Sequence, residues 1–369
     1  MNTVIYDITS HCNLKCKHCY NSKYLDGATE IEIDIKKVVS KIVEIKPEVL
    51  LIQGGEPLLV KNLELLIKTI KKYRIKVYIT TNATLLTEYR AISLLKSGIS
   101  GFFFSIESSE AKKNNLIRGK GSFEKAIFNI EKFIDIYDMA IRKKIINEIL
   151  LCFSVTITPL NIHGLSDINN MFLLAKKYKV NDLSFAFMIE SGNGIALSNY
   201  KEISNIDIAG MIVEISKKFP EIRVRIPYKK LMFDYLKMKY GRIDNVWGEK
   251  STCPAGSKIV YLNKNLDIHP CGYVNKFDMS KQIIQETVIK STKTFSINNF
   301  DKFIRIKMDI DKNSNIFCKK CEYFEECIKI CPYDYECGER NINVSECVEL
   351  KKRMSKMRGE NEYSLSTIN

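Results

Sequence analysis

His11-Cys12-Asn13-Leu14-Lys15-Cys16-Lys17-His18-Cys19-Tyr20 is the stretch around which the chain is organised. Its three cysteines have the spacing Cys-x3-Cys-x2-Cys, so their sulfurs can turn from one loop towards one metal centre. Three thiolates on a four-iron cluster leave one iron open, whereas a structural zinc needs a fourth closed ligand, here His11 or His18. Each histidine is the immediate neighbour of a cysteine and would converge poorly on the same ion. We therefore favour the cluster.

The composition describes a globular protein of 369 residues, long enough for a large domain and a smaller one. No apolar stretch suggests a signal peptide or a membrane span, so we expect a cytoplasmic protein. In that compartment, twelve cysteines indicate metal ligation rather than disulfides. The formal net charge is +14, but the lysines are spread over many polar faces without a basic and aromatic platform. We expect no nucleic-acid partner.

Short apolar runs alternate with amphipathic patterns through the first 220 or so residues. The expected strands cover residues 4–8, 49–53, 77–80, 102–106, 149–157 and 183–189. The expected helices cover residues 31–43 (with Thr29 as a possible cap), 58–72, 87–98, 122–137, 166–179 and 206–219. This alternation predicts an α/β fold with a parallel sheet covered by helices, and six units fit a partial, open (β/α)6 barrel of the TIM type.

Unusual residues follow several expected strands, at the barrel end where ligands bind. The second strand leads into Gly54-Gly55-Glu56-Pro57, whose glycines allow close backbone approach and whose carboxylate can accept from an ammonium group. Polar residues also follow the third, fourth and fifth strands, namely Asn82, Ser105, Glu107, Arg118 and Asn161. The bland alternative at Asn82 and Asn161 is ordinary turn chemistry.

The cysteine triplet followed by Gly-Gly-Glu-Pro resembles the motifs of radical S-adenosylmethionine (radical SAM) enzymes. The resemblance implies that Cys12, Cys16 and Cys19 hold a catalytic [4Fe-4S] cluster. Its open iron would chelate S-adenosyl-L-methionine (SAM), which an electron from the cluster cleaves to a 5′-deoxyadenosyl radical.

The same resemblance implies a set of SAM contacts. They are Tyr20 beside the adenine, Gly54, Gly55 and Glu56 at the amino group, Asn82 near the ribose, Ser105 at the carboxylate or ribose, Arg118 at the carboxylate, and Asn161 lining the pocket. Glu107 stands where the family more often has an aspartate, so its role is left open.

Seven cysteines gather in the last hundred or so residues. They are Cys253, Cys271, Cys318, Cys321, Cys327, Cys331 and Cys347. A structural zinc is one interpretation, because zinc ribbons use Cys-x2-Cys pairs such as 318–321. Their order and spacing instead resemble the SPASM extension of radical SAM enzymes, which carries two auxiliary [4Fe-4S] clusters.

The family's ligation pattern implies that Cys318, Cys321, Cys327 and Cys347 hold one auxiliary cluster. Cys253, Cys271 and Cys331 would hold the other, with only three thiolates and an open iron unless another side chain substitutes. The glycine usual before the second of these cysteines is replaced by Leu266, beside asparagines that tolerate a left-handed turn.

Two cysteines remain. Cys152 lies in an apolar strand and is expected to be a small buried hydrophobe. Cys337 is a candidate for the missing ligand, a hydrogen-atom donor or an inert thiol. Gly272 stands where anaerobic sulfatase maturases, by the same resemblance, have an aspartate base, which disfavours that activity.

These patterns predict a radical SAM core over residues 1–225, a linker and bridging helix over 226–250, a SPASM domain over 251–350 and a basic tail over 351–369. The resemblance implies a peptide-modifying oxidoreductase that matures a ribosomally synthesised peptide by crosslinking, epimerisation or oxidation. It also implies a flavodoxin- or ferredoxin-type electron donor. The lack of a long apolar stretch predicts no membrane partner. A separate recognition protein for the peptide is a further expectation. The alternatives are a radical dehydrogenase or cofactor-biosynthesis enzyme acting on a small molecule, and a noncatalytic zinc or electron-transfer protein.

Overall fold

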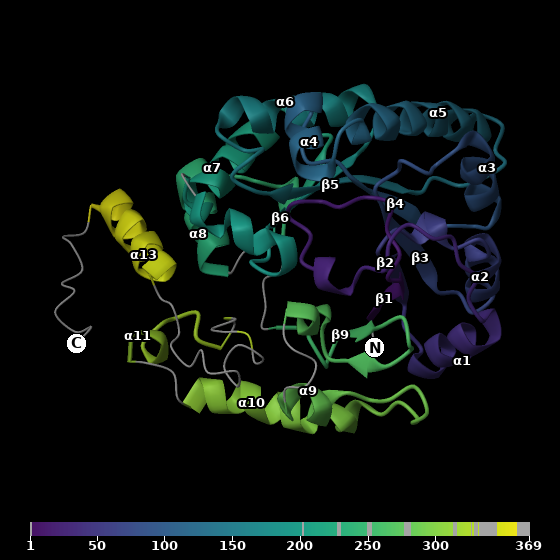
Figure 1. The fold of residues 1–369 in the computed structure, drawn as a ribbon. Coiled ribbons are helices and arrows are strands. Elements are labelled where there is room, and N and C mark those ends of the chain that lie inside the picture. Colours follow the sequence, from purple (N-terminus) through teal and green to yellow (C-terminus); the bar gives the residue numbers. More distant parts are fainter. Residues whose placement is uncertain are drawn as a thin grey trace.

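A single open sheet runs through the protein. The computed structural model describes residues 2–200, 203–226, 230–248, 253–276, 282–312, 316–325, 327, 331 and 345–359. The strands are β1 (Thr3–Thr9), β2 (Val49–Gly54), β3 (Lys76–Thr81), β4 (Gly101–Ser105), β5 (Leu150–Ile157), β6 (Asp182–Phe187), β7 (Arg223–Arg225), β8 (Val246–Trp247), β9 (Ile259–Leu262) and β10 (Ile268–His269). Their order in the sheet is β10-β9-β1-β2-β3-β4-β5-β6-β7-β8. Because β10 and β8 do not pair with each other, the barrel is open (Figure 1).

Helices cover the outer face of the barrel strands (Figure 1). The helices are α1 (Ile35–Ile45), α2 (Leu63–Lys71), α3 (Glu88–Lys96), α4 (Ala111–Arg118), α5 (Ser122–Arg142), α6 (Leu165–Lys177), α7 (Asn205–Ser216), α8 (Lys230–Tyr240), α9 (Gln282–Thr287), α10 (Asp301–Lys312), α11 (Ile316–Lys319) and α13 (Ser345–Arg358). Short 3-10 helices span Ser22–Tyr24, Pro57–Leu59, Gly192–Tyr200, Gly272–Lys276 and Ile297–Phe300. The predicted fold class, a partial TIM-type barrel built on a parallel sheet, is confirmed.

Burial of apolar side chains between the sheet and its helices explains why the strands read as apolar runs. Phe102 and Phe104 on β4 are fully buried, and the ring of Phe133 on α5 lies 5.0 Å and 5.7 Å from theirs in edge-on contacts. Aromatic pairs in this geometry add to the free energy gained by burying their area. The packing fixes the position of β4, whose carboxyl end carries part of the candidate site.

Two of the predicted helix starts are wrong. Thr29 does not cap the first helix, because Ile31 is extended and exchanges backbone hydrogen bonds with Leu59 and Lys61. The helix begins at Ile35, and Asp34 caps it by accepting a hydrogen bond from Lys37 N at 3.0 Å. The helix expected from residue 58 begins at Leu63, after the 3-10 turn.

The cysteine-rich extension joins the barrel through its first strand. β9 pairs in parallel with β1, with Thr3 opposite Ile259 and Tyr6 opposite Leu262. β10 returns antiparallel to β9 and forms the edge of the sheet. Leu266 takes the left-handed conformation between them, with φ 64°. This register brings the extension beside the cysteine loop that follows β1.

No helix in the described part of the chain is both long and apolar enough to cross a membrane.

Candidate active site

The cysteine loop lies at the carboxyl end of β1 and is held by backbone hydrogen bonds. Cys12 N donates to Gly27 O at 2.7 Å, and Lys17 N donates to Ile117 O at 2.8 Å, at the end of α4. Cys16 is buried, while Cys12 and Cys19 are half-buried. The loop therefore presents its three thiols inward, next to the ends of the barrel strands.

The electrostatics of the three thiols suit metal ligation. Burial raises the pKa of Cys12 to about 12 and that of Cys19 to about 11, and it also raises the pKa of Cys16. The thiols lie near enough to raise one another's pKa, so three thiolates together need a positive centre to balance them.

The surroundings also fit a bound group. The Nδ1 atoms of His11 and His18 are buried and have no partner among the described residues. The described residues contain no group of three His, Cys, Asp or Glu side chains arranged for a single metal ion. A cluster differs from such a site because each thiolate binds a different iron. The donor set therefore fits the predicted cluster, with Cys12, Cys16 and Cys19 as the residues that would hold it.

The Gly54-Gly55-Glu56-Pro57 turn packs directly on the backbone of the cysteine loop. Gly55 N donates to Thr9 O and Glu56 N donates to His11 O, each at 2.7 Å. A Cβ added at Gly55 would lie 2.0 Å from His11 O, so only glycine fits there. The motif holds the loop in place as well as facing the site.

Glu56 joins the ends of β2 and β3. Its carboxylate accepts from Leu58 N at 3.0 Å, from Thr81 Oγ1 at 2.7 Å and from Asn82 N at 2.8 Å. Burial raises the pKa of Glu56, and these donors oppose the rise. Three of about four acceptor positions are thus filled by the chain itself. The predicted contact between Glu56 and the SAM amino group remains a prediction.

Asn82 connects β3 to the cysteine loop. Its Nδ2 donates to Asn13 Oδ1 at 2.9 Å, and its Oδ1 accepts from Thr84 Oγ1 at 2.6 Å. Asn13 completes the triangle by donating to Thr84 Oγ1 at 2.8 Å. The loop between Cys12 and Cys16 is therefore anchored by the segment after β3 as well as by the glycine turn after β2.

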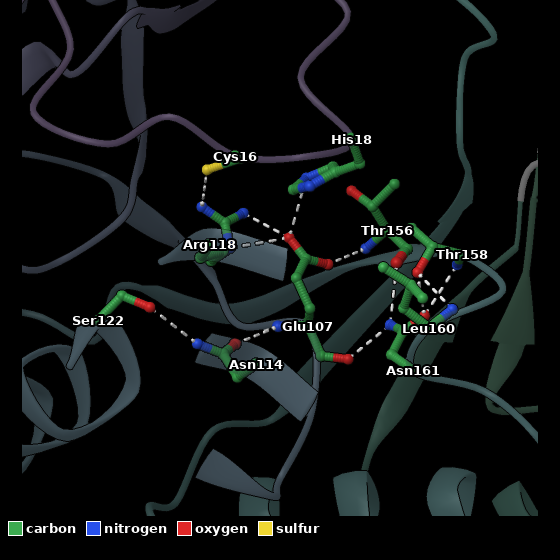
Figure 2. A network of polar contacts seen from close by, with 10 residues as sticks. All are labelled: Cys16, His18, Glu107, Asn114, Arg118, Ser122, Thr156, Thr158, Leu160 and Asn161. Atoms are coloured by element: carbon green, nitrogen blue, oxygen red, sulfur yellow. Dashed lines mark hydrogen bonds and ion pairs between the residues drawn. The ribbon is translucent and has the colours of Figure 1, made fainter. Parts of the chain in front are cut away.

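Glu107 is the centre of the polar network shown in Figure 2. It is fully buried, and its Oε1 accepts from Arg118 Nε at 2.9 Å and also from Arg118 Nη2. His18 Nε2 lies 3.2 Å from the same oxygen, and Thr156 N donates to Oε2 at 2.6 Å. Arg118 Nη1 also lies 3.8 Å from Cys16 Sγ. The network ties the cysteine loop to α4 and to the ends of β4 and β5.

Acidification is expected to remove the stabilisation that Glu107 provides. Burial would raise the pKa of Glu107, but Arg118 and His18 lower it to about 2, against about 4.3 in an unfolded chain. Because the folded pKa is the lower one, the stabilisation is present above about pH 5 and is lost as the pH falls towards 2. The difference in pKa corresponds to about 3 kcal/mol.

Urea unfolding of wild type and Glu107→Gln between pH 7 and 3 measures this effect. We expect the free-energy difference between the two proteins to shrink as the pH falls. Glu32→Gln is the control, because this exposed carboxylate has no ion-pair partner among the described residues, and the trend should be absent there. A Glu107→Gln difference that stays constant with pH would contradict the prediction.

The remaining predicted SAM contacts lie around the same barrel end. Asn161 is buried and bonded within the chain: its Nδ2 donates to Glu107 O at 2.6 Å and to Thr156 O at 3.0 Å (Figure 2). Ser105 ends β4 opposite Ser154. Tyr20 is half-buried, and its hydroxyl accepts from Gln53 Nε2 at 3.5 Å. Their SAM contacts stay predictions.

A buried carboxylate missed by the sequence analysis lies on the other side of the cysteine loop. Asp7 on β1 accepts from Tyr261 Oη at 2.6 Å, from Gln53 Nε2 at 3.0 Å and from Asn21 Nδ2 at 3.3 Å. It lines a cavity together with Gly54, Gly55, Tyr261 and residues 263–265 and 275. The sequence did contain a sign of this buried carboxylate, because an aspartate interrupts the apolar run of residues 4–8.

The second cysteine set is partly described. Cys253, Cys271 and Cys331 each lie near enough to Lys307 to raise its pKa, and their grouping as one ligand set stays a prediction. Cys321 N donates to Cys318 O at 2.9 Å in the short turn that joins them. Cys337 lies outside the described residues. Cys152 is buried in β5, opposite Phe103 of β4 and Asp182 of β6, as expected for a small hydrophobe.

The barrel is open, three cysteines follow its first strand and a Gly-Gly-Glu turn follows its second, as the resemblance to radical SAM enzymes predicts. Residues 6–147 match the family model of the radical SAM superfamily. The chain thus carries a radical SAM domain.

Curated relatives match mainly over this domain. A probable GTP 3′,8-cyclase from Archaeoglobus fulgidus is 32% identical over 130 residues, which are 35% of this chain and 43% of that protein. An AdoMet-dependent heme synthase from Methanosarcina barkeri is 22% identical over 284 residues, covering 73% of this chain and 76% of that protein. The first match spans less than half of the relative's length.

Solved structures match over more of the chain. Streptococcus suis SuiB bound to its precursor peptide SuiA superposes with a TM-score of 0.67 and 16% identity, covering 89% of this chain and 71% of SuiB. The protein anSMEcpe, bound to AdoMet and the Cp18Cys peptide, superposes with a TM-score of 0.62 and 18% identity. The match covers 97% of this chain and 96% of anSMEcpe. At these identities the likeness shows the fold alone.

Proposed function

We propose that the protein is a radical SAM enzyme with a SPASM extension that abstracts a hydrogen atom from a peptide substrate. The observation that carries the proposal is the gathering of three thiols beside the Gly54-Gly55 turn at the carboxyl ends of the strands. When bound, a [4Fe-4S] cluster there would pass one electron to SAM and release methionine and the 5′-deoxyadenosyl radical. The chain's own residues hold the loop, orient SAM and exclude water.

We propose that a SPASM domain over residues 251–350 holds the two auxiliary clusters, after a radical SAM core over residues 1–225 and a linker over 226–250. Cys318, Cys321, Cys327 and Cys347 would form one ligand set. Cys253, Cys271 and Cys331 would form the other, which is supported by their shared neighbour Lys307. These centres would accept the electron that the substrate radical gives up during crosslinking or oxidation. Epimerisation would instead return a hydrogen atom to the radical, for which Cys337 is the candidate donor.

A peptide substrate is favoured by the structural neighbours, two of which were solved with bound peptides. We propose a ribosomally made peptide, a cytoplasmic setting and a flavodoxin- or ferredoxin-type donor. A small-molecule substrate is the second candidate, because the curated relatives include a GTP cyclase and a heme synthase. Oxidation of the sulfatase-maturase kind is disfavoured, since Gly272 supplies no carboxylate.

The test uses protein purified without oxygen, with SAM and dithionite. We expect about twelve irons per chain, from three four-iron clusters, and formation of 5′-deoxyadenosine. A precursor peptide encoded beside the gene should increase the formation of 5′-deoxyadenosine, and its own mass should change on modification. GTP and porphyrins should neither increase 5′-deoxyadenosine formation nor be modified. Zinc without iron would contradict the proposal, and stimulation by a small molecule alone would favour the second candidate.

A further inference from the structure

Lys307 on α10 is a half-buried lysine with an unusual set of neighbours. Its Nζ donates to Ala255 O at 2.7 Å and to Cys253 O at 3.0 Å. It also lies 5.3 Å from the centre of the Phe303 ring. The ammonium is therefore fixed against the backbone of the segment that carries Cys253, with one N–H left for another acceptor.

The charge of Lys307 has no carboxylate partner among the described residues, whereas Lys302 on the same helix pairs with Glu286. Lys307 Nζ donates to the carbonyl oxygen of Cys253, and the thiols of Cys253, Cys271 and Cys331 are the negatively chargeable groups near it. A desolvated ammonium without an anion is unfavourable. The only candidates for an anion that the described surroundings offer are these three sulfurs.

The backbone brings the first two cysteines together beneath this ammonium. Gly256 N donates to Pro270 O at 3.0 Å, which ties the segment after Cys253 to the one before Cys271. Figure 1 shows α10 running alongside α9, below the β9 hairpin. The ammonium on α10 is thus held by the backbone of residues 253–255, which the Gly256 hydrogen bond ties to the segment before Cys271.

We propose that Lys307 is the fixed counter-charge of the centre held by Cys253, Cys271 and Cys331, and that it raises the reduction potential of that centre. The inference rests on the proposed function, which places an auxiliary cluster there. A cluster that gains an electron becomes more negative, so a cation fixed beside it favours the reduced form. Lys307 is a positioning and electrostatic residue, since a protonated amine is not a ligand. Its charge would make this centre a better electron acceptor.

The test is a redox titration in which electron paramagnetic resonance follows the reduced clusters. The full chain carries Cys12→Ala, Cys16→Ala and Cys19→Ala, so that the cluster predicted on these cysteines gives no signal. The signal lost on further replacement Cys253→Ala identifies the centre. We expect Lys307→Gln to shift its reduction equilibrium at least tenfold towards the oxidised form, which is about 59 mV for one electron. Lys307→Arg should shift it less than threefold.

Arg305→Gln is the matched control, because it removes one positive charge from an exposed position of the same helix. It should leave the potential unchanged. An unchanged potential in Lys307→Gln would overturn the inference, and so would loss of the centre in both the Gln and the Arg variants. Loss of the cluster in Lys307→Gln but not in Lys307→Arg would support the inference, because the positive charge would then decide whether the cluster is bound. If no signal depends on Cys253, the proposed ligand set itself is wrong.

Discussion

Replacing Cys12, Cys16 and Cys19 together by alanine is expected to remove about four of about twelve irons per chain and to abolish 5′-deoxyadenosine formation. The reason is that the three thiols lie on one loop and influence one another's pKa, so we expect them to act as one ligand set. The auxiliary sets lie on separate segments beyond residue 252 and should keep their iron. Iron and acid-labile sulfide content, with product analysis, measure both effects.

The buried Cys152 on β5 supplies the control for this experiment. Cys152→Ala removes a thiol that faces the sheet interior, and it should leave the iron content and the activity unchanged. An unchanged iron content in the triple variant would mean that the loop holds no cluster. A fall of one zinc per chain would instead favour the alternative in which a histidine completes a zinc site.

The barrel could be predicted from the sequence because its signals are local. Each buried strand is an apolar run, and each is followed by an amphipathic pattern that ends at a turn, so the six units can be read along the chain. The cysteine spacing and the Gly-Gly-Glu-Pro turn are local in the same sense. The Thr29 cap was wrong because Ile31 pairs with residues nearly thirty positions later, and such a contact leaves no mark in a short window.

The polar core of the site could not be predicted, because it forms where distant segments meet. Glu107 collects donors from the cysteine loop, from α4 and from β5, and its partner Arg118 was expected to face SAM alone. Asp7 likewise depends on Tyr261, more than 250 residues away in the chain. Lys307 lies in a helix whose pattern carries no sign of the cysteines around it. The contacts from Asp7 to Tyr261 and from Glu107 to Thr156 follow from the pairing of neighbouring strands, whereas those of Lys307 depend on how α10 packs.

Replacing Gly55 by alanine is expected to disrupt the site more than any other single substitution of its size. A Cβ at this position would lie 2.0 Å from His11 O, 2.5 Å from His11 C and 3.1 Å from Cys12 N. These are backbone atoms, so no side-chain rotation relieves the contact. The turn must move away from the cysteine loop, which breaks the hydrogen bond from Gly55 to Thr9 and the one from Glu56 to His11.

Overpacking of this kind costs about 1–3 kcal/mol and occasionally more, and we expect at least the upper value here. Urea unfolding of the metal-free protein measures that cost, and iron content after reconstitution measures the effect on the loop. Gly164→Ala is the control, since a Cβ there meets nothing within 4 Å and the backbone is extended. It should change stability by less than about 1 kcal/mol. Equal behaviour of the two variants would mean that the turn does not hold the loop, whereas loss of iron only in Gly55→Ala would show that the second strand positions the cysteines of the first.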